Sequence, residues 1–436
     1  MNCSATVSFR LRLSPFGASG IKYWIYVADA NKVHRLGGKG AYTGLAKRAK
    51  GVSEAVVGGR GAKRVRAGHP WVYRSDISEM AGEAGDVVRI VDRGGKFLGM
   101  AFANPRSEIS LRVASRREEE IGERWFRARI EAAVEYRKSL EIDTSAYRLI
   151  HSEADGIPGL VVDKYGEYVV LQIGSAAVEE RLGVVVGILE EALSPSGILL
   201  RGDIASRRRE GLSQEIRVLA GDVPEGVVVR EGGVKYMADL RGGQKTGAFL
   251  DQRENHLAAG RLSRGRVLDV FSYVGGFALH AAKNADSVEA VDASGPALEA
   301  ARKNAELDGI ENIAFTRANA FDLLRERSDA GEVCDTIILD PPAFAKSKRE
   351  LAKARKAYKE INLRAMKMLS AGGVLVTCSC SHHLSRGMFE ETLRSAAGDA
   401  GAAMRVVEWR GQAGDHPEVL AIPETSYLKC AVLRRM

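Results

Sequence analysis

The chain has 436 residues, of which 45% are hydrophobic and 28% are charged. This composition excludes wholesale disorder and indicates two to four globular domains of roughly 100–200 residues each. No run of about 18 apolar residues occurs, which excludes a helix that spans a membrane. Five cysteines are too few for a disulfide framework, so we expect a reducing, cytoplasmic setting.

The excess positive charge belongs to the first segment. Residues 1–51 contain nine Lys/Arg and a single acid, Asp29, whereas residues 52–436 contain 55 residues of each sign. Three interpretations remain: a basic arm that contacts RNA, an organellar transit peptide, and an extension upstream of the true start. The last is favoured, because the segment lacks any sustained helix or strand period. We assign residues 1–54 to this extension.

The next part of the chain predicts two small domains. Residues 55–126 contain short β-rich segments separated by turn residues, which indicates a small β domain. Residues 119–140 show the apolar stripe of an amphipathic helix, a plausible connector. Residues 127–240 predict a central α/β module. Its expected elements are strands within 147–175, a helix at 178–194, a buried strand at 198–203 and a hairpin at 227–240.

From residue 241 onward, strands alternate with helices of 8–20 residues. This rhythm predicts a parallel, doubly wound, Rossmann-like α/β sheet. The expected strands are 266–271, 287–294, 312–320, 335–340 and 372–380. Two further strands, at 406–410 and 426–435, have no helix between them, so we expect an antiparallel final strand.

Ligands of such a sheet bind beyond the carboxyl ends of its strands. The residues predicted there are Asp269, Asp292, Asn319, Asp340 and the pair Cys378/Cys380. A carboxylate at the second strand end suits a ribose diol, and an amide at the third suits an adenine edge. Turn formation or helix capping could also explain both residues.

The fourth and fifth strand ends carry the candidate chemistry. Asp340-Pro341-Pro342 gives a fixed acid beside a stiff backbone wall that suits a flat ring. A thiol in TCSCS (377–381) can act as a nucleophile, whereas a buried cysteine there would be inert. His382 and His383 lack a partner cluster with zinc-like spacing, so no metal site is expected.

The ordered set of motifs resembles a known family. GQKTGAFLDQR, LDVFSYVGGF, AVDAS, LDPPAF, YKEINLRAMKML and LVTCSCSHHLS are similar to strings of the class I S-adenosylmethionine (SAM)-dependent methyltransferases. Within these, the chain resembles the PUA-containing large-subunit ribosomal RNA cytosine-5 methyltransferases over about residues 55–436. The resemblance implies a PUA-like RNA-binding domain at 55–126 and a SAM-dependent methyltransferase domain at 241–436.

The resemblance also implies roles at matching positions. Cys380 aligns with the family's nucleophile, although Cys378 lies in a similar string, and Asp340 would contact the target base. Large-subunit ribosomal RNA would be the partner, and a homodimer is compatible with a sequence that does not fix the oligomeric state. The residues assigned to SAM are Lys245, Thr246, Gly247, Gln252, Asp269, Phe271, Gly275, Gly276, Asp292, Asn319 and Asp340.

Two other functions stay open at the sequence level. A base-nitrogen methyltransferase, of the guanine N2 type, could use the same sheet and the same D-P-P string, since an amine needs no covalent activation. A PUA protein that binds RNA without catalysis could retain a decayed sheet, but the intact strand-end residues argue against it. The residue that removes the C5 proton is not identifiable from the sequence.

Overall fold

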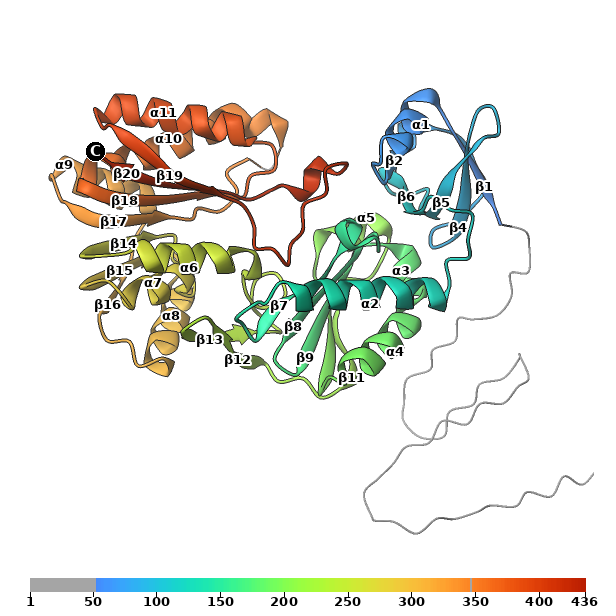
Figure 1. The fold of residues 1–436 in the computed structure, drawn as a ribbon, viewed down its shortest axis with the longest axis horizontal. Helices are drawn as coiled ribbons and strands as arrows, with labels where there is room; N and C mark the ends of the chain where they lie inside the picture. Colours follow the sequence, from blue (N-terminus) through green and yellow to red (C-terminus); the bar gives the residue numbers. More distant parts are fainter. Residues whose placement is uncertain (1–51, 346) are drawn as a thin grey trace, which may run out of the picture. The chain divides into compact units, whose positions relative to one another are not determined.

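A computed structural model describes residues 52–345 and 347–436 of the chain. The interpretations of residues 1–51 therefore lie outside the described residues. The described part contains a six-stranded sheet, a five-stranded sheet, a two-stranded hairpin and a seven-stranded sheet, in chain order (Figure 1). No helix among these residues is long and apolar enough to cross a membrane.

The first sheet forms a small β domain with strand order β2-β6-β5-β4-β1-β3. Its core is formed by apolar side chains that alternate along the strands, among them Val57, Val88, Ile90 and Leu111. The predicted short β-rich segments of residues 55–126 are present as strands of this sheet. The elements are β1 (Glu54–Val57), α1 (Gly59–Arg66), β2 (Trp71–Tyr73), β3 (Ile77–Met80), β4 (Val87–Asp92), β5 (Phe97–Ala103) and β6 (Ile109–Ser115).

The central module is a five-stranded sheet with order β11-β10-β9-β8-β7. Helix α2 packs against α4, and the apolar faces of both join the core beside the sheet. The elements are α2 (Glu123–Ser139), β7 (Ala146–His151), β8 (Leu160–Tyr165), β9 (Tyr168–Ile173), α3 (Ala176–Glu180), α4 (Leu182–Leu193), β10 (Gly197–Arg201), α5 (Ala205–Glu210) and β11 (Ile216–Gly221). The predicted hairpin is β12 (Gly226–Glu231) with β13 (Val234–Asp239).

The seven-stranded sheet has the order β16-β15-β14-β17-β18-β20-β19. Strands β14 to β18 are parallel to one another, and β20 pairs antiparallel with both β18 and β19. The predicted doubly wound sheet with an antiparallel final strand is confirmed. Its strands are β14 (Arg266–Val270), β15 (Ser287–Asp292), β16 (Ile313–Arg317), β17 (Cys334–Leu339), β18 (Leu369–Ser379), β19 (Met404–Arg410) and β20 (Lys429–Arg435).

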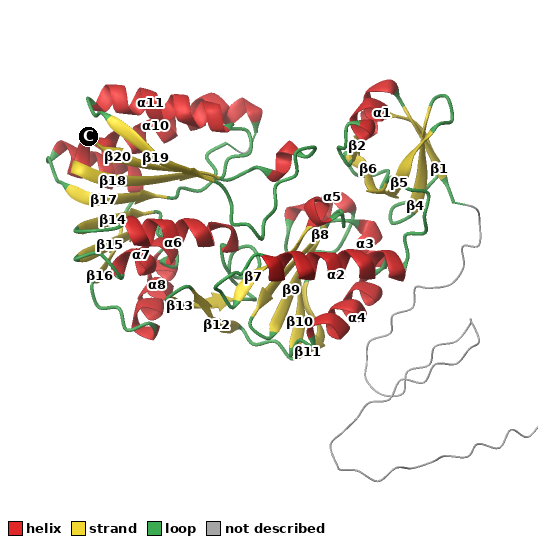
Figure 2. Cartoon of the chain, viewed as in Figure 1, coloured by secondary structure: helices red, strands yellow, loops and turns green. Residues whose placement is uncertain are grey.

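Helices cover both faces of this sheet (Figure 2). Leu268 and Val270 of β14 join a core with α9, α10 and α11, whereas Val267 joins a core with α6 and α7 on the opposite face. This alternation is the expected result of a strand buried on both sides. The helices are α6 (Arg253–Leu262), α7 (Gly276–Ala282), α8 (Gly295–Leu307), α9 (Ala320–Asp329), α10 (Leu351–Met368) and α11 (Arg386–Ala400).

Candidate active site

A cavity of about 680 Å³ opens at the carboxyl ends of the parallel strands. Eight residues predicted for catalysis or cofactor binding line it: Lys245, Gln252, Phe271, Gly276, Asp292, Asn319, Asp340 and Cys380. Aromatic side chains supply much of the remaining wall, including Phe321, Phe344 and Tyr427. The cavity therefore combines apolar area with a few carboxylates, as ligand pockets commonly do.

Asp292, at the end of β15, organises the turn that follows β14. One of its oxygens accepts a hydrogen bond from the backbone N–H of Tyr273 at 2.9 Å, and the other accepts one from Ser294 at 2.8 Å. Tyr273 has a φ of 48° and Phe271 a φ of 68°, which non-glycine residues rarely adopt. Asp292 thus fixes a strained turn and still faces the cavity.

Asn319, after β16, is the N-cap residue of α9. Its side-chain oxygen accepts hydrogen bonds from the N–H groups of Phe321 and Asp322, so it caps the N-terminus of α9. Asn319 also lines the cavity, and its contact with adenine stays a prediction. Beside it, the rings of Phe321 and Phe344 lie 5.8 Å apart and form an apolar wall that suits a flat base.

Asp340 lies at the end of β17 and accepts a hydrogen bond from Gln252 Nε2 at 2.9 Å. Gln252 is itself held by Asn255, which donates to its side-chain oxygen at 2.6 Å. Burial raises the pKa of Asp340 to about 6, and Asp251 adds to the effect. Near neutral pH this carboxyl can therefore both accept and release a proton.

The two cysteines at the end of β18 differ in environment. Cys378 is fully buried in the core and stands opposite Cys430 in the β18–β20 register. Cys380 lies just beyond the strand and lines the cavity, with its Sγ 4.0 Å from the carbonyl oxygen of Pro341. Burial, and then the charge of Asp340, raise the pKa of Cys380 to about 11. Of the two cysteines, Cys380 is the one that lines the cavity. Its raised pKa means that near neutral pH it is a protonated thiol.

Four of the residues predicted for SAM do not line the cavity, and their cofactor roles stay predictions: Thr246, Gly247, Asp269 and Gly275. Thr246 is buried and its hydroxyl donates to Asp163 at 2.6 Å, which ties the loop to the central module. Asp269 lies fully buried behind the wall, with neither carboxylate oxygen in a well-formed hydrogen bond within the described part of the chain. Burial holds its pKa well above the usual range.

Tyr427 of the cavity wall and Lys429 behind it carry no recognisable pattern in the sequence. Tyr427, which lines the cavity, donates its hydroxyl to Asp251 at 2.7 Å, and Lys245 Nζ binds the same carboxylate at 2.6 Å. Lys429 donates to the carbonyl oxygens of Ser381 and Tyr427, each at 2.8 Å, and so holds the residue after Cys380 in place. The sequence does not indicate Tyr427 or Lys429 as site residues, because only the fold brings them beside β18.

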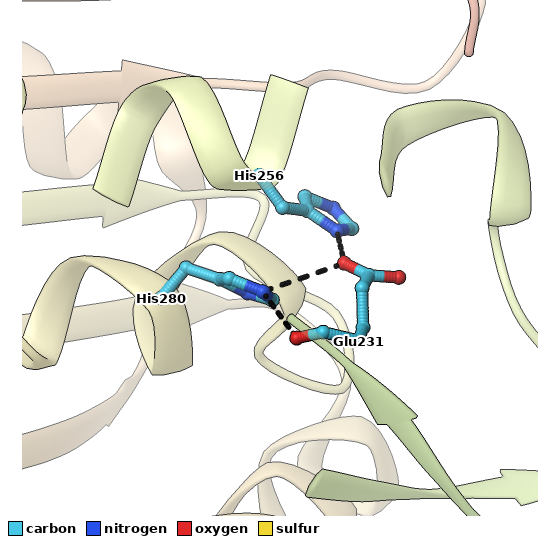
Figure 3. A group of neighbouring side chains, drawn as sticks. All are labelled: Glu231, His256 and His280. Atoms are coloured by element: carbon cyan, nitrogen blue, oxygen red, sulfur yellow. Dashed lines mark hydrogen bonds and ion pairs between the residues drawn. The ribbon is translucent and has the colours of Figure 1, made fainter. Parts of the chain in front are cut away.

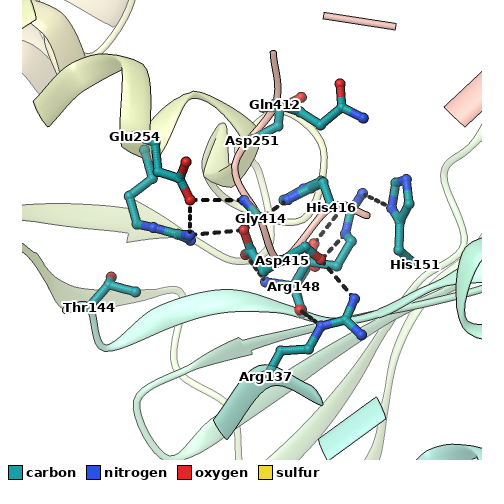
Figure 4. A network of polar contacts seen from close by, with 12 residues as sticks. Arg137, Thr144, Arg148, His151, Asp251, Glu254, Gln412, Gly414, Asp415 and His416 are labelled. Carbon is teal, nitrogen blue, oxygen red and sulfur yellow. Dashed lines mark hydrogen bonds and ion pairs between the residues drawn. The ribbon is translucent and has the colours of Figure 1, made fainter. Parts of the chain in front are cut away.

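A buried polar network anchors the loop that leads to Tyr427 (Figure 4). Arg137 donates to the carbonyl oxygen of Asp415 at 2.7 Å, and the backbone N–H of Arg148 donates to the Asp415 carboxylate at 2.7 Å. Arg253 completes the set with an ion pair to Asp415 at 3.0 Å. The central module thereby fixes one wall of the cavity.

Comparison with known proteins places the chain among methyltransferases. A family model described as S-adenosylmethionine-dependent methyltransferase matches residues 203–431, and one described as PUA-like domain matches residues 56–116. The chain belongs to this methyltransferase family. The "Ribosomal RNA large subunit methyltransferase I" of Photobacterium profundum is 40% identical over 84% of this chain and 95% of that protein. The protein of the same name from Vibrio cholerae is 41% identical over 85% and 97%.

Solved structures agree with the fold of this methyltransferase. A SAM-dependent methyltransferase from Streptococcus mutans has a TM-score of 0.75 and 21% identity, covering 87% of this chain and 99% of that one. A second structure, of a methyltransferase complexed with S-adenosylhomocysteine (SAH), has a TM-score of 0.77. SAM is therefore the cofactor, and the cavity fits it: Asp292 suits the ribose diol, and the phenylalanine wall suits the adenine.

Proposed function

We propose that this methyltransferase forms 5-methylcytosine in large-subunit ribosomal RNA through a covalent adduct on Cys380. The relatives' names support the class of substrate. The observation that carries the chemistry is that, among the described residues, Cys380 is the cysteine that lines the cavity, where the charge of Asp340 helps to raise its pKa. A thiol has no role in the transfer of a methyl group to an exocyclic amine, whereas C5 of cytosine requires covalent activation.

The proposed reaction begins with a proton transfer. Because the pKa of Cys380 is raised, its thiol must lose a proton as it adds to C6. Asp340, with a pKa near 6, accepts that proton and passes it to N3 of the base, where negative charge develops on addition. Proton and charge are thus balanced within the site, and the target base must leave its stack to reach it.

Methyl transfer follows from the adduct. Bound SAM supplies an electrophilic methyl group to C5, which is enamine-like once the Cys380 sulfur is bonded to C6. A base then removes the C5 proton, the C6–S bond breaks as the C5–C6 double bond is restored, and the proton on N3 returns through Asp340 to the departing Cys380 sulfur. Gln252 holds Asp340 in position throughout, since its amide donates to the carboxylate.

An RNA that carries 5-fluorocytosine tests this proposal, because fluorine at C5 blocks the proton loss that releases the enzyme. We expect wild type to form a stable adduct in the presence of SAM, and Cys380→Ala to form none and to lose methylation. Cys378→Ala is the matched control: it removes a buried thiol two residues away and should still form the adduct. Bisulfite mapping of ribosomal RNA then locates the product.

The outcomes separate the alternatives. An adduct that persists in Cys380→Ala and disappears in Cys378→Ala would transfer the nucleophile to Cys378. If wild type forms no adduct and Cys380→Ala still methylates RNA, the cytosine-5 chemistry is wrong and methylation of a base nitrogen replaces it.

A further inference from the structure

A second cavity, of about 360 Å³, adjoins the cofactor cavity. Lys245 and Tyr427 line both cavities, so these two side chains form the wall between them. His382, two residues after Cys380, also lines the second cavity. The small β domain, the central sheet and the loop before β20 supply the remaining walls. The second cavity therefore lies next to the place where the target base meets Cys380.

Both cations in the wall of the second cavity are already paired. Arg148 donates two hydrogen bonds to Asp163, at 2.7 and 2.8 Å, and Lys245 binds Asp251 at 2.6 Å. Glu153, an acid of the same wall, is paired in turn with an arginine of β6 at 2.9 Å. Neither cation is left to balance a buried phosphate group, so the interior of the cavity suits an uncharged ligand.

His151 presents a fixed hydrogen-bond donor to this cavity. Its Nδ1 lies 3.2 Å from Arg148 Nη1 (Figure 4). A guanidinium only donates, so Nδ1 accepts, and in the neutral imidazole Nε2 carries the proton. Burial, and then the positive charge of Arg148, lower the pKa of His151 to about 2, so the ring is neutral at physiological pH. Within the described part of the chain, its Nε2–H meets no acceptor.

Two histidines on the opposite side of the cofactor cavity have a different partner (Figure 3). There, the Glu231 carboxylate lies 2.7 Å from His256 Nδ1 and 3.6 Å from His280 Nε2. A carboxylate at such a distance stabilises a protonated imidazole, whereas an arginine destabilises one. The neutral state of His151 thus follows from its charged neighbour as well as from burial.

Gln172 presents a fixed acceptor on the same face of the central sheet. His151 of β7 pairs with Val161 of β8, and Val161 pairs with Gln172 of β9. Directly opposite residues share a face, so His151 and Gln172 lie on one side of the sheet with their Cα atoms about 10 Å apart. Gln172 Nε2 donates to the carbonyl oxygen of Lys245 at 3.2 Å, which leaves Oε1 to accept from a ligand.

Aromatic rings supply a flat wall beside this donor and acceptor. The ring of Tyr427 lies 6.4 Å from that of His151, at an interplanar angle of 29°, and 5.6 Å from that of His382, at 33°. Nucleic-acid bases stack on such rings, and unstacked bases are recognised through donors and acceptors on their edges. An uncharged cavity with an aromatic wall, one donor and one acceptor therefore matches the chemistry of a nucleobase.

We propose that the second cavity binds a base of the RNA that is a near neighbour of the methylated nucleotide, through the His151 Nε2–H donor and the Gln172 Oε1 acceptor. The inference rests on the proposed RNA substrate, but not on which atom of the target base receives the methyl group. A base within a chain fits better than a free nucleotide, because both wall cations are paired and the chain's phosphates can stay outside. Two bases held on either side of Tyr427 then select the nucleotide that reaches Cys380.

Methylation kinetics with modified RNA test this proposal. Radiolabelled SAM reports incorporation into large-subunit ribosomal RNA whichever atom receives the methyl group. Substrates assembled by ligation carry an abasic nucleotide in place of one near neighbour of the methylated position at a time. We expect one of these substrates to lower kcat/KM of the wild-type protein by about 10-fold to 100-fold, through the loss of stacking and hydrogen bonds.

His151→Phe keeps an aromatic ring and removes the donor. It should raise KM for intact RNA about 3-fold to 10-fold and leave the affinity for SAH unchanged in calorimetry. With the sensitive abasic substrate it should have no further effect, because the base that His151 contacts is gone. Gln172→Met removes the acceptor and should show the same dependence, which keeps the test valid if His151→Phe does not fold. His383→Phe is the matched control, since His383 lines neither cavity, and its kinetics should equal those of wild type.

Three results would overturn the proposal. One is a loss in both variants that is equal for intact and abasic RNA, which would show a merely structural role. Another is wild-type activity that no abasic substitution lowers. The third is saturable binding of AMP, GMP, CMP or UMP that His151→Phe abolishes without any change in RNA kinetics, which would assign the cavity to a free nucleotide. A product methylated on a base nitrogen would refute the cytosine-5 chemistry alone, and the abasic comparison would still decide the role of the second cavity.

Discussion

The five-stranded central sheet and the seven-stranded catalytic sheet both combine strands with helices, but they differ in the direction of their strands. In the central sheet only β9 and β10 are parallel, and its other neighbours run antiparallel. In the catalytic sheet four successive pairs are parallel, so the carboxyl ends of five strands meet at one edge. The cavity lies at that edge. Strand direction, more than composition, decides which α/β module carries a ligand site.

Buried charge shows the same contrast. In the central module, charged side chains are paired: Arg207 is fully buried and binds Glu179 at 2.7 Å, and Arg148 binds Asp163 at 2.7 Å. At the catalytic edge, Asp269 and Asp340 are left with raised pKa values. Paired charges stabilise the central module, whereas incompletely compensated ones at the catalytic edge are available for chemistry.

The largest expected effect is on the central module. Arg207→Met should lower the free energy of unfolding by about 3–5 kcal/mol, because the carbonyl oxygens of Ile173 and Ser213 and one oxygen of Glu179 lose their buried donor. Denaturant unfolding measures this, and SAH affinity of the folded protein should not change. Arg217→Met is the matched control: this arginine also binds Glu179 but is 30% exposed, so we expect a loss below about 1 kcal/mol. Equal effects of the two variants would contradict the distinction.

The next largest effect is on the affinity for SAM at the carboxyl ends of the parallel strands. Asp292→Ala should weaken SAM binding by roughly 1.5–3 kcal/mol, since it removes charge-assisted hydrogen bonds to the ribose and releases the turn at Tyr273. Asn319→Ala should have a smaller effect on affinity, because its oxygen caps α9. Isothermal calorimetry distinguishes them, and an unchanged affinity in Asp292→Ala would exclude the ribose role.

The free energy of unfolding should also depend on pH through Asp340. The folded-state pKa of Asp340 is raised to about 6 from 3.8, so the folded protein binds this proton more tightly than the unfolded chain. Stability therefore falls as pH rises from about 4 to 6. Asp340→Asn, which can still accept from Gln252, should have a free energy of unfolding about 3 kcal/mol above that of wild type at pH 8 and equal to it at pH 4. A difference that is independent of pH would show that Asp340 is not perturbed.

The smallest effect is expected from the basic segment. Removal of residues 1–51 should leave activity and RNA affinity within about 2-fold at physiological salt, because the two family models match only residues beyond it. A filter-binding titration over a range of salt concentrations measures this. A large loss of affinity, with a shallower dependence on salt, would show that these lysines and arginines contact phosphates.

The sequence predicted the parallel strands of the catalytic sheet well, because β14, β15 and β17 are short, largely apolar runs that carry an aspartate at or beside their end. It missed β2, of three residues, and β1 and β3, of four residues each, which are too short to show a period. It did not decide whether Cys378 or Cys380 faces the ligand, because the register of β18 against β20 determines which of the two is buried. Glu231 and His256 gave no signal either, because the two side chains meet only through packing of a hairpin against a helix.

The position of β20 has a consequence for damaged transcripts. This strand follows β19 in the chain but lies between β18 and β19, and its Lys429 holds the backbone beside Cys380. A premature stop codon between β19 and Lys429 would thus leave most of the protein intact and still remove the strand that joins β18 to β19 beside the active site. Such a product would retain its PUA-like domain, and where that domain binds RNA, it would occupy the site of the complete enzyme without being able to replace it.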